Sequence, residues 1–285
     1  MPYKTVGGEK PGEEYKRVEL YYEVHGPPDA PPIVFIGGWA SYHWIWFRQI
    51  PEMSEKYRCI VFDNRGAGRS SKPDYPYTIK MMADDTVGLM EALGIENAHI
   101  LGISMGGLIA QQVALSYPEK LRSLIIVSSH FGGPNQIPMD DRTMALLIAV
   151  PTETISAEQA RDMRYQATFS PGFLQENEDI LQQIERWIAQ YPAPLYAQIH
   201  QSSATAGFNS ESELGKITAP TLIIHGTADR AVPTGNSDLL ASKIPNARKV
   251  LLEGAAHFCI IEKYEEFNKT VMGFIDEIEG GPGPS

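Results

Sequence analysis

The chain has 285 residues and a formal net charge of −11, with 35 acidic and 24 basic side chains. This length suits one large domain or two small ones, and the negative charge argues against a nucleic acid or an anionic membrane as a partner. The sequence has no run of about eighteen apolar residues, so we expect no membrane-spanning helix.

The N-terminal residues 1–17 contain no apolar stretch of the kind that secretory signals carry. The two cysteines, Cys59 and Cys259, are far apart in the sequence, and we expect two buried free thiols rather than a disulfide. These features lead us to expect a cytoplasmic protein. Whether it is a monomer or a homodimer stays open.

Seven short apolar segments are predicted to be β-strands. Most are continuous apolar runs bounded by glycine or polar residues, which is typical of strands that are buried on both faces of a parallel sheet. They cover residues 20–26, 32–38, 59–66, 98–104, 121–129, 220–226 and 248–254.

Helical spacing of apolar residues appears between these strands. One helix is predicted over residues 79–93, with Thr78 as its N-cap and Gly94 as its stop. Others are predicted over residues 105–117 and 264–278. We expect the apolar side of each helix to pack against the core.

The alternation of strands and helices predicts the α/β class, with a mostly parallel central sheet flanked by helices. It fails over residues 132–215, where the pattern is helical. We therefore expect a core of residues 1–131 and 216–285, with residues 132–215 as a helical lid over the carboxyl edge of the sheet, where open α/β sheets bind ligands. Apolar side chains of this insertion, such as Met144 and Leu147, should pack on the sheet or line a pocket.

Ser104 stands where a predicted strand turns into a predicted helix, in the segment Gly102-Ile103-Ser104-Met105-Gly106. A nucleophilic serine on such a sharp turn has a strained backbone, and the residues two before and two after it must be small to avoid collision. The pattern and its setting together favour a serine nucleophile.

A serine hydroxyl needs a base to become a good nucleophile. Three histidines are candidates: His130 and His257 follow predicted strands and His225 lies at the end of one, and each could have a purely structural role. We favour His257 because it comes last in the chain, in the hydrolase order Ser…Asp/Glu…His. The acid between them would be Asp229, in the loop after the penultimate predicted strand, although aspartate is also common in turns.

Acyl transfer places negative charge on the former carbonyl oxygen, so donors must already point to that position. The candidates are the backbone N–H groups of Met105 and Trp39. Gly37 and Gly38 would let the second of these approach closely.

A substrate pocket is predicted around Gly38 and several aromatic side chains. For each aromatic residue, packing between the lid and the sheet is an equally good interpretation. The aromatic residues are Tyr42, Trp44, Phe131 and Trp187.

No metal or cofactor is expected. The sequence has neither H-E-x-x-H nor C-x-x-C spacing. The segment of residues 65–70 resembles a dinucleotide-binding loop, but the pattern is incomplete and the prolines that follow, Pro73 and Pro76, prevent a helix from opening there.

Four segments together resemble sequence blocks of the α/β-hydrolase superfamily, in its serine esterase, enol-lactonase and cofactor-free haloperoxidase-like branch. The segments are DNRGAGRS from Asp63, GISMGG from Gly102, HGTADRAVP from His225 and GAAHFCIIE from Gly254. The resemblance covers essentially the whole chain and is least detailed in the insertion.

The resemblance implies an α/β-hydrolase fold with Ser104 as nucleophile, Asp229 as acid and His257 as base. It also implies Trp39 and Met105 as backbone oxyanion donors and no cofactor. Where the family usually has His-Gly, this chain has Gly37-Gly38, so the shape of that loop is a question for the structure.

The expected activity is hydrolysis of a small-molecule carboxylic ester through an acyl-enzyme. A lactonase, a thioesterase, a C–C bond hydrolase or a perhydrolase on the same residues is an alternative, and a non-catalytic ligand-binding module is the least favoured one. Dehalogenases and epoxide hydrolases of this superfamily use an aspartate nucleophile, so Ser104 argues against both.

Overall fold

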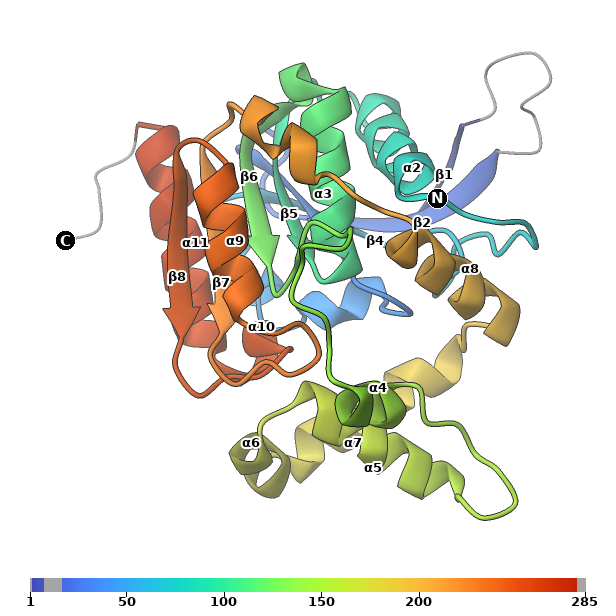
Figure 1. Ribbon diagram of the computed structural model, residues 1–285. Helices are drawn as coiled ribbons and strands as arrows, with labels where there is room; N and C mark the ends of the chain where they lie inside the picture. Colours follow the sequence, from blue (N-terminus) through green and yellow to red (C-terminus); the bar gives the residue numbers. More distant parts are fainter. Residues whose placement is uncertain (1, 8–16, 281–285) are drawn as a thin grey trace.

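The computed structural model describes residues 2–7 and 17–280. Within these residues, eight strands form one sheet in the order β1-β2-β4-β3-β5-β6-β7-β8 (Figure 1). The strands from β4 to β8 run parallel, whereas β1 and β2 are antiparallel to their neighbours. Their bounds are β1 Tyr3–Val6, β2 Val18–His25, β3 Pro32–Ile36, β4 Arg58–Phe62, β5 Ala98–Ile103, β6 Leu121–Val127, β7 Thr221–Gly226 and β8 Ala247–Leu252.

All seven predicted strands are confirmed, with ends shifted by a few residues. Sequence reasoning missed β1, which pairs with β2 from Tyr3 opposite Tyr21 to Val6 opposite Val18. This strand is four residues long, and only one of its residues, Val6, is buried. It therefore lacks the continuous apolar run that identifies the buried strands.

Helices cover both faces of the sheet, as predicted for the α/β class. Two core clusters result, and neighbouring strand residues point to opposite ones: Val34 and Ile36 of β3 to one, Ile33 and Phe35 to the other. The first cluster packs under α2 Ile79–Ala92, α3 Met105–Ser116 and α9 Gly235–Lys243, and the second under α1 Ile50–Met53, α10 Cys259–Glu262 and α11 Tyr264–Ile278.

The predicted start and stop of α2 are confirmed. The Thr78 hydroxyl accepts a hydrogen bond from the Met81 N–H at 3.1 Å, as an N-cap should. Gly94 follows the helix with a φ of 67°, a left-handed conformation that favours glycine. Cys59 and Cys259 are buried free thiols, as expected.

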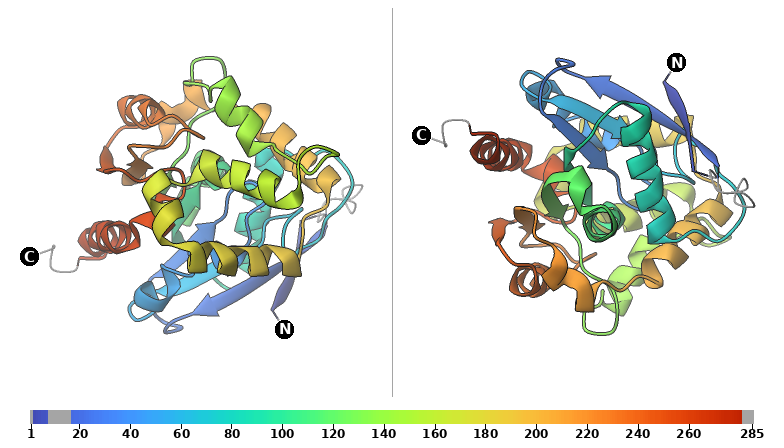
Figure 2. Two further views of the ribbon diagram at one scale, coloured as in Figure 1. Left: turned by 90° about the horizontal axis from the view of Figure 1, so that it is seen from below. Right: turned by 90° about the horizontal axis from the view of Figure 1, so that it is seen from above.

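Five α-helices lie between β6 and β7, and they are followed by the short 3₁₀ helix Glu211–Lys216. Figure 1 shows α4 to α7 beyond the carboxyl ends of β6 to β8, and the left view of Figure 2, from below, shows them in front of the sheet. The helices are α4 Asp141–Leu147, α5 Ala157–Thr168, α6 Pro171–Glu176, α7 Glu178–Gln190 and α8 Leu195–Ala206.

The two ends of this helical segment pair with each other. Gly132 and Asn209 form an antiparallel bridge, and the Ser210 N–H donates to the Phe131 carbonyl at 2.9 Å. The chain thus leaves and re-enters the sheet layer at one place. The division into a core and a lid at residues 132–215 stays a prediction. None of the helices in the described residues combines the length and the apolar character needed to cross a bilayer.

A buried ion pair ties the turn after β4 to α2. Arg65 Nε lies 2.5 Å from Asp85 Oδ2 and Arg65 Nη2 lies 2.6 Å from Asp85 Oδ1, and both side chains are buried. Because this paired geometry satisfies two charges inside the protein, removing one partner leaves the other charge buried and uncompensated.

We predict that Asp85→Asn lowers the free energy of unfolding by about 3–5 kcal/mol. The neighbouring Asp84→Asn is the matched control: Asp84 forms an exposed pair with Lys80 and accepts from the Tyr117 hydroxyl at 2.6 Å, a bond that the Asn oxygen can still accept. An exposed ion pair contributes about 1 kcal/mol or less. Urea unfolding of both variants measures the difference. Equal losses would contradict a special role for the buried pair.

Candidate active site

Ser104 occupies a strained turn between β5 and α3. Its backbone has φ 56° and ψ −122°, a left-handed conformation that is rare outside glycine. Three hydrogen bonds hold it: the Ser104 N–H donates to the Val127 carbonyl at 2.9 Å, and its carbonyl accepts from Gly107 N–H at 2.9 Å and from Ser129 Oγ at 2.8 Å. The predicted strand–turn–helix setting is therefore present.

The glycines on both sides of Ser104 are required by close backbone contacts. A Cβ on Gly102 would lie 2.0 Å from the Gly106 carbonyl oxygen, and a Cβ on Gly106 would lie 2.2 Å from the Ile36 carbonyl oxygen. Gly38 approaches from the β3 loop, where a Cβ would lie 3.1 Å from Ser104 Cβ. The glycines thus allow the β3 loop, the turn and α3 to meet.

Asp229 and His257 come together from the loops after β7 and β8. His257 Nδ1 lies 2.9 Å from Asp229 Oδ2, and both side chains are buried. The Val232 N–H donates to Asp229 Oδ1 at 2.9 Å. Although burial raises the pKa of this carboxyl, the neighbouring imidazoles of His257 and His225 outweigh it and hold the pKa well below its usual range.

His225 is a contact of Asp229 that the sequence analysis did not assign. Its Nε2 lies 2.9 Å from the Val232 carbonyl and 3.1 Å from Asp229 Oδ2. Because a carbonyl oxygen can only accept, His225 Nε2 carries the proton. This N–H is shared between the Val232 carbonyl oxygen and Asp229 Oδ2. The position of His225 at the end of β7, four residues before Asp229, is the signal that could have indicated this contact.

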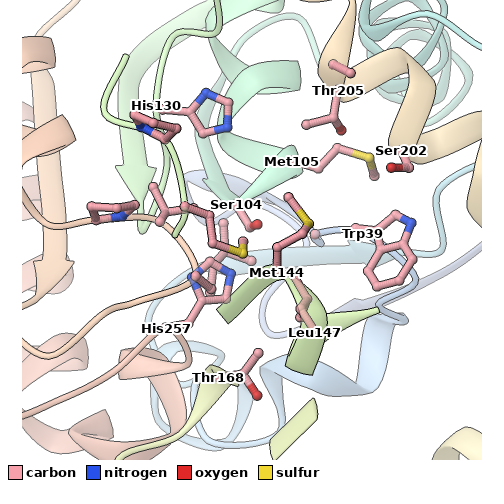
Figure 3. A pocket seen from close by; sticks show the side chains of 18 of the residues that line it. Trp39, Ser104, Met105, His130, Met144, Leu147, Thr168, Ser202, Thr205 and His257 are labelled. Atoms are coloured by element: carbon pink, nitrogen blue, oxygen red, sulfur yellow. The ribbon is translucent and has the colours of Figure 1, made fainter. Parts of the chain in front are cut away.

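Ser104 and His257 line one cavity of about 370 Å³, with Asp229 behind the imidazole. Figure 3 shows Ser104, Met105, His257 and Trp39 around this cavity, with Trp39 and His257 on opposite sides of Ser104. Ser104 is the residue directly before α3, so the Met105 N–H belongs to the first turn of that helix, whose N–H groups have no partner within the helix.

Side chains from two other segments hold the β3 loop, residues 37–42, in which Gly37 stands at the position of the expected histidine. Asn64 Nδ2 donates to the Gly37 carbonyl at 3.0 Å, and Gln201 Oε1, from α8, accepts from the Ala40 N–H at 2.9 Å. In the part of the chain that the structure describes, the backbone N–H of Trp39 has no hydrogen-bond acceptor, whereas its indole N–H donates to the Gln198 carbonyl at 2.9 Å. Neither Asn64 nor Gln201 was identified from the sequence, because both act across long sequence separations.

Gly38 lines the cavity, as predicted. The four aromatic residues that were predicted to line it do not: Tyr42, Trp44, Phe131 and Trp187. Trp44 stacks on Trp187 with ring centroids 5.1 Å apart, and Tyr42 packs edge-on against Trp44. Phe131 is buried in the core cluster on the α3 side. This corrects the prediction: the rings pack against one another or inside the core cluster, so they are not available to the cavity.

The cavity wall comes instead from the segment between β6 and α5 and from α8. The sequence analysis considered Met144 and Leu147 for this wall, and both line it. Residues it missed include Met139, Ile148 and Thr205. The sequence around each of these residues predicts a helix or a loop, but it does not predict which side of that helix or loop lies against the cavity.

Comparison with known proteins identifies the family. A family model described as alpha/beta hydrolase fold matches residues 31–171 and 145–264. The chain therefore belongs to the α/β-hydrolase family, as its motifs predict.

Individual relatives extend this likeness over nearly the whole chain. The chain is 30% identical over 282 residues to a protein of Azorhizobium caulinodans with the provisional name carbamate hydrolase RutD, covering 98% of this chain and 100% of that one. It is 30% identical over 254 residues to 3-oxoadipate enol-lactonase 2 of Acinetobacter baylyi, covering 89% and 92%. The crystal structure of the enol-lactonase from Burkholderia xenovorans LB400 is 27% identical, with a TM-score of 0.81 over 96% and 99% of the two chains. The relatives are hydrolases, which supports a hydrolase here.

We predict that Gly106→Ala destabilises the protein by about 1–3 kcal/mol or more, because the added methyl group would overlap the backbone of the β3 loop. The matched control is Gly172→Ala in α6, where a Cβ would meet nothing within 4 Å. That variant should be neutral or slightly stabilising, by about 0.5–1 kcal/mol. Denaturant unfolding decides; similar stability of both variants would disprove the crowding argument.

Proposed function

We propose that this protein hydrolyses small carboxylic esters through an acyl-enzyme formed on Ser104, with His257 as base and Asp229 as its acid partner. The observation that carries the proposal is the hydrogen bond of 2.9 Å between His257 Nδ1 and Asp229 Oδ2, made beside a cavity that Ser104 and His257 both line. A nucleophile, a base and an orienting acid in one place are what acyl transfer requires.

In the first half-reaction the Ser104 hydroxyl attacks the ester carbonyl while His257 Nε2 accepts its proton. The negative oxygen of the tetrahedral intermediate accepts hydrogen bonds from the backbone N–H groups of Met105 and Trp39. His257 then gives the proton to the departing alcohol oxygen. In the second half-reaction His257 takes a proton from water, the hydroxide attacks the acyl group, and Ser104 leaves with the proton.

Asp229 has two tasks in this scheme. Its carboxylate accepts the Nδ1 proton of His257, which leaves Nε2 without a proton and able to act as the base for Ser104. Its negative charge then stabilises the imidazolium that forms during attack. The low pKa of Asp229, which its imidazole neighbours cause against the effect of burial, keeps the carboxylate ionised at neutral pH.

A lactone is the second candidate substrate class. The chain is similar to two proteins named enol-lactonase, and a lactone differs from an open ester only in that its alcohol stays tethered to the acyl group. The same residues would perform both reactions. Thioester and C–C bond hydrolysis and perhydrolysis use the same machinery and are distinguished by product analysis.

We predict that Ser104→Ala lowers kcat by about a million-fold, because the nucleophile is lost, while circular dichroism and the unfolding midpoint stay close to the wild type. A fluorophosphonate should label the wild type on Ser104, as peptide mass spectrometry would show. Residual activity of a few per cent with contaminating hydrolases excluded, or labelling at another residue, would refute the assignment.

We also predict that short to medium acyl chains are preferred. Residues 132–215, acting as a lid, would cover a cavity of about 370 Å³, and each methylene group that fits adds about 0.8 kcal/mol of burial. Beyond the cavity's length this gain stops and clashes begin. The measurement is kcat/KM for p-nitrophenyl esters from acetate to palmitate. A maximum at palmitate with activation at an oil–water interface would indicate a lipase.

A further inference from the structure

His130 lies on the cavity wall without a part in the proposed mechanism. It follows the end of β6 by three residues and lines the same cavity as Ser104 and His257. In the view of Figure 3, Ser104 lies between His130 and His257. From the sequence, His130 was one of three candidate bases and was left with a structural role when His257 was favoured.

The hydrogen bonding of His130 determines where its ring proton sits. The Gly132 N–H donates to His130 Nδ1 at 2.9 Å, so Nδ1 is the unprotonated nitrogen. The proton of the neutral ring is therefore on Nε2. Within the described residues, Nε2 has no hydrogen-bond partner, yet it is not one of the buried polar atoms that solvent cannot reach. Because His130 lines the cavity, this accessible N–H is a donor available to a ligand there.

The ring also stays neutral at ordinary pH. Burial, helped by the nearby imidazoles of His257 and His225, lowers the pKa of His130 to about 4. Above that pH, His130 Nε2–H is a neutral donor on the cavity wall, and the hydrogen bond from Gly132 to Nδ1 fixes the orientation of the ring. A ligand oxygen that accepts from this fixed N–H replaces water there and gains an oriented hydrogen bond.

No charged side chain of the described residues lines the cavity. Arg230 directly precedes two lining residues, Ala231 and Val232, but its guanidinium donates to the Thr143 hydroxyl at 3.4 Å. A carboxylate inside the cavity would lose its hydration without gaining a cation. An uncharged substrate avoids that penalty.

We infer that His130 Nε2–H binds a second, neutral oxygen of the substrate, and that the substrate is an uncharged ester or lactone carrying a keto or ether oxygen apart from the reacting carboxyl group. This inference rests on the hydrolase function proposed for Ser104. It assigns His130 to specificity, since the side chain touches the substrate away from the bond that breaks.

The test compares esters that differ in one oxygen remote from the reacting carbonyl. Two matched pairs are p-nitrophenyl 4-oxopentanoate with pentanoate, and 5-oxohexanoate with hexanoate. One neutral hydrogen bond raises kcat/KM by about three- to tenfold, so we expect the wild type to prefer the oxo ester by this factor in at least one pair. The mono-p-nitrophenyl ester of glutarate, which carries a carboxylate, should be at least about tenfold poorer than pentanoate.

Two variants of His130 separate its two ring nitrogens. His130→Asn keeps an acceptor near the Nδ1 position for Gly132 but removes the donor at Nε2, so the oxo preference should fall to about one. His130→Gln places an amide N–H near the Nε2 position and should keep part of the preference. Because each ratio is taken within one variant, a general loss of activity or stability cancels.

A binding measurement makes the test independent of turnover. Ser104→Ala protein with ¹⁵N-labelled histidine is titrated with methyl 5-oxohexanoate and with methyl hexanoate, and His130→Asn in the same background assigns the His130 signals. We expect the spectrum of a neutral ring protonated on Nε2, and a shift of Nε2 with the oxo ester only.

The outcomes distinguish this inference from the proposed function. If the wild type hydrolyses hexanoate but shows no oxo preference, or if His130→Asn keeps the preference, or if the glutarate ester is preferred, the inference is wrong and the esterase proposal stands. If no ester is hydrolysed, the proposed function fails, and the titration alone decides the inference. A ring protonated on Nδ1, or equal shifts with both esters, would overturn it.

Discussion

Backbone crowding at the turn between β5 and α3 is the constraint on which the site depends. Gly102 and Gly106 bring the turn against itself and against the Ile36 carbonyl so closely that a methyl group fits at neither. Three hydrogen bonds then hold Ser104 at φ 56°, and rigid packing stores the strain of that conformation. The same contacts place the β3 loop, with Gly38 and Trp39, beside the serine. One crowded turn thereby positions the proposed nucleophile and both proposed oxyanion donors.

Two buried carboxylates of this protein, Asp85 and Asp229, have different kinds of partner. Arg65 and Asp85 neutralise each other in a buried paired contact that joins a turn to a helix, and the result is purely structural. Asp229 is buried too, but its partners are two imidazoles that can exchange protons. This arrangement leaves the carboxylate ionised and its charge available to a neighbouring group that gains a proton during reaction. His130, next to this cluster, is kept neutral by burial and by the same imidazoles.

The aromatic residues show why a pocket is harder to predict than a catalytic group. Trp44 and Trp187 lie far apart in the sequence and stack on each other, and nothing in either sequence segment indicates that partnership. A large apolar side chain gains about the same free energy beside a ligand as inside a core, so its identity does not decide between the two. Whether such a side chain lines a pocket or fills the core is decided by how the helical segment packs on the sheet, and this packing depends on the whole chain.

The sequence by itself determined the strands from β2 to β8, the main helices and the positions of Ser104, Asp229 and His257, because these depend on local periodicity, turn chemistry and the order of short motifs. It also determined the family. Only the tertiary structure decided which side chains meet: His225 with Asp229, Gln201 with the β3 loop, and the proton on Nε2 of His130. Those contacts join segments whose approach is set by the packing of helices on a sheet, and no local pattern of residues encodes that approach.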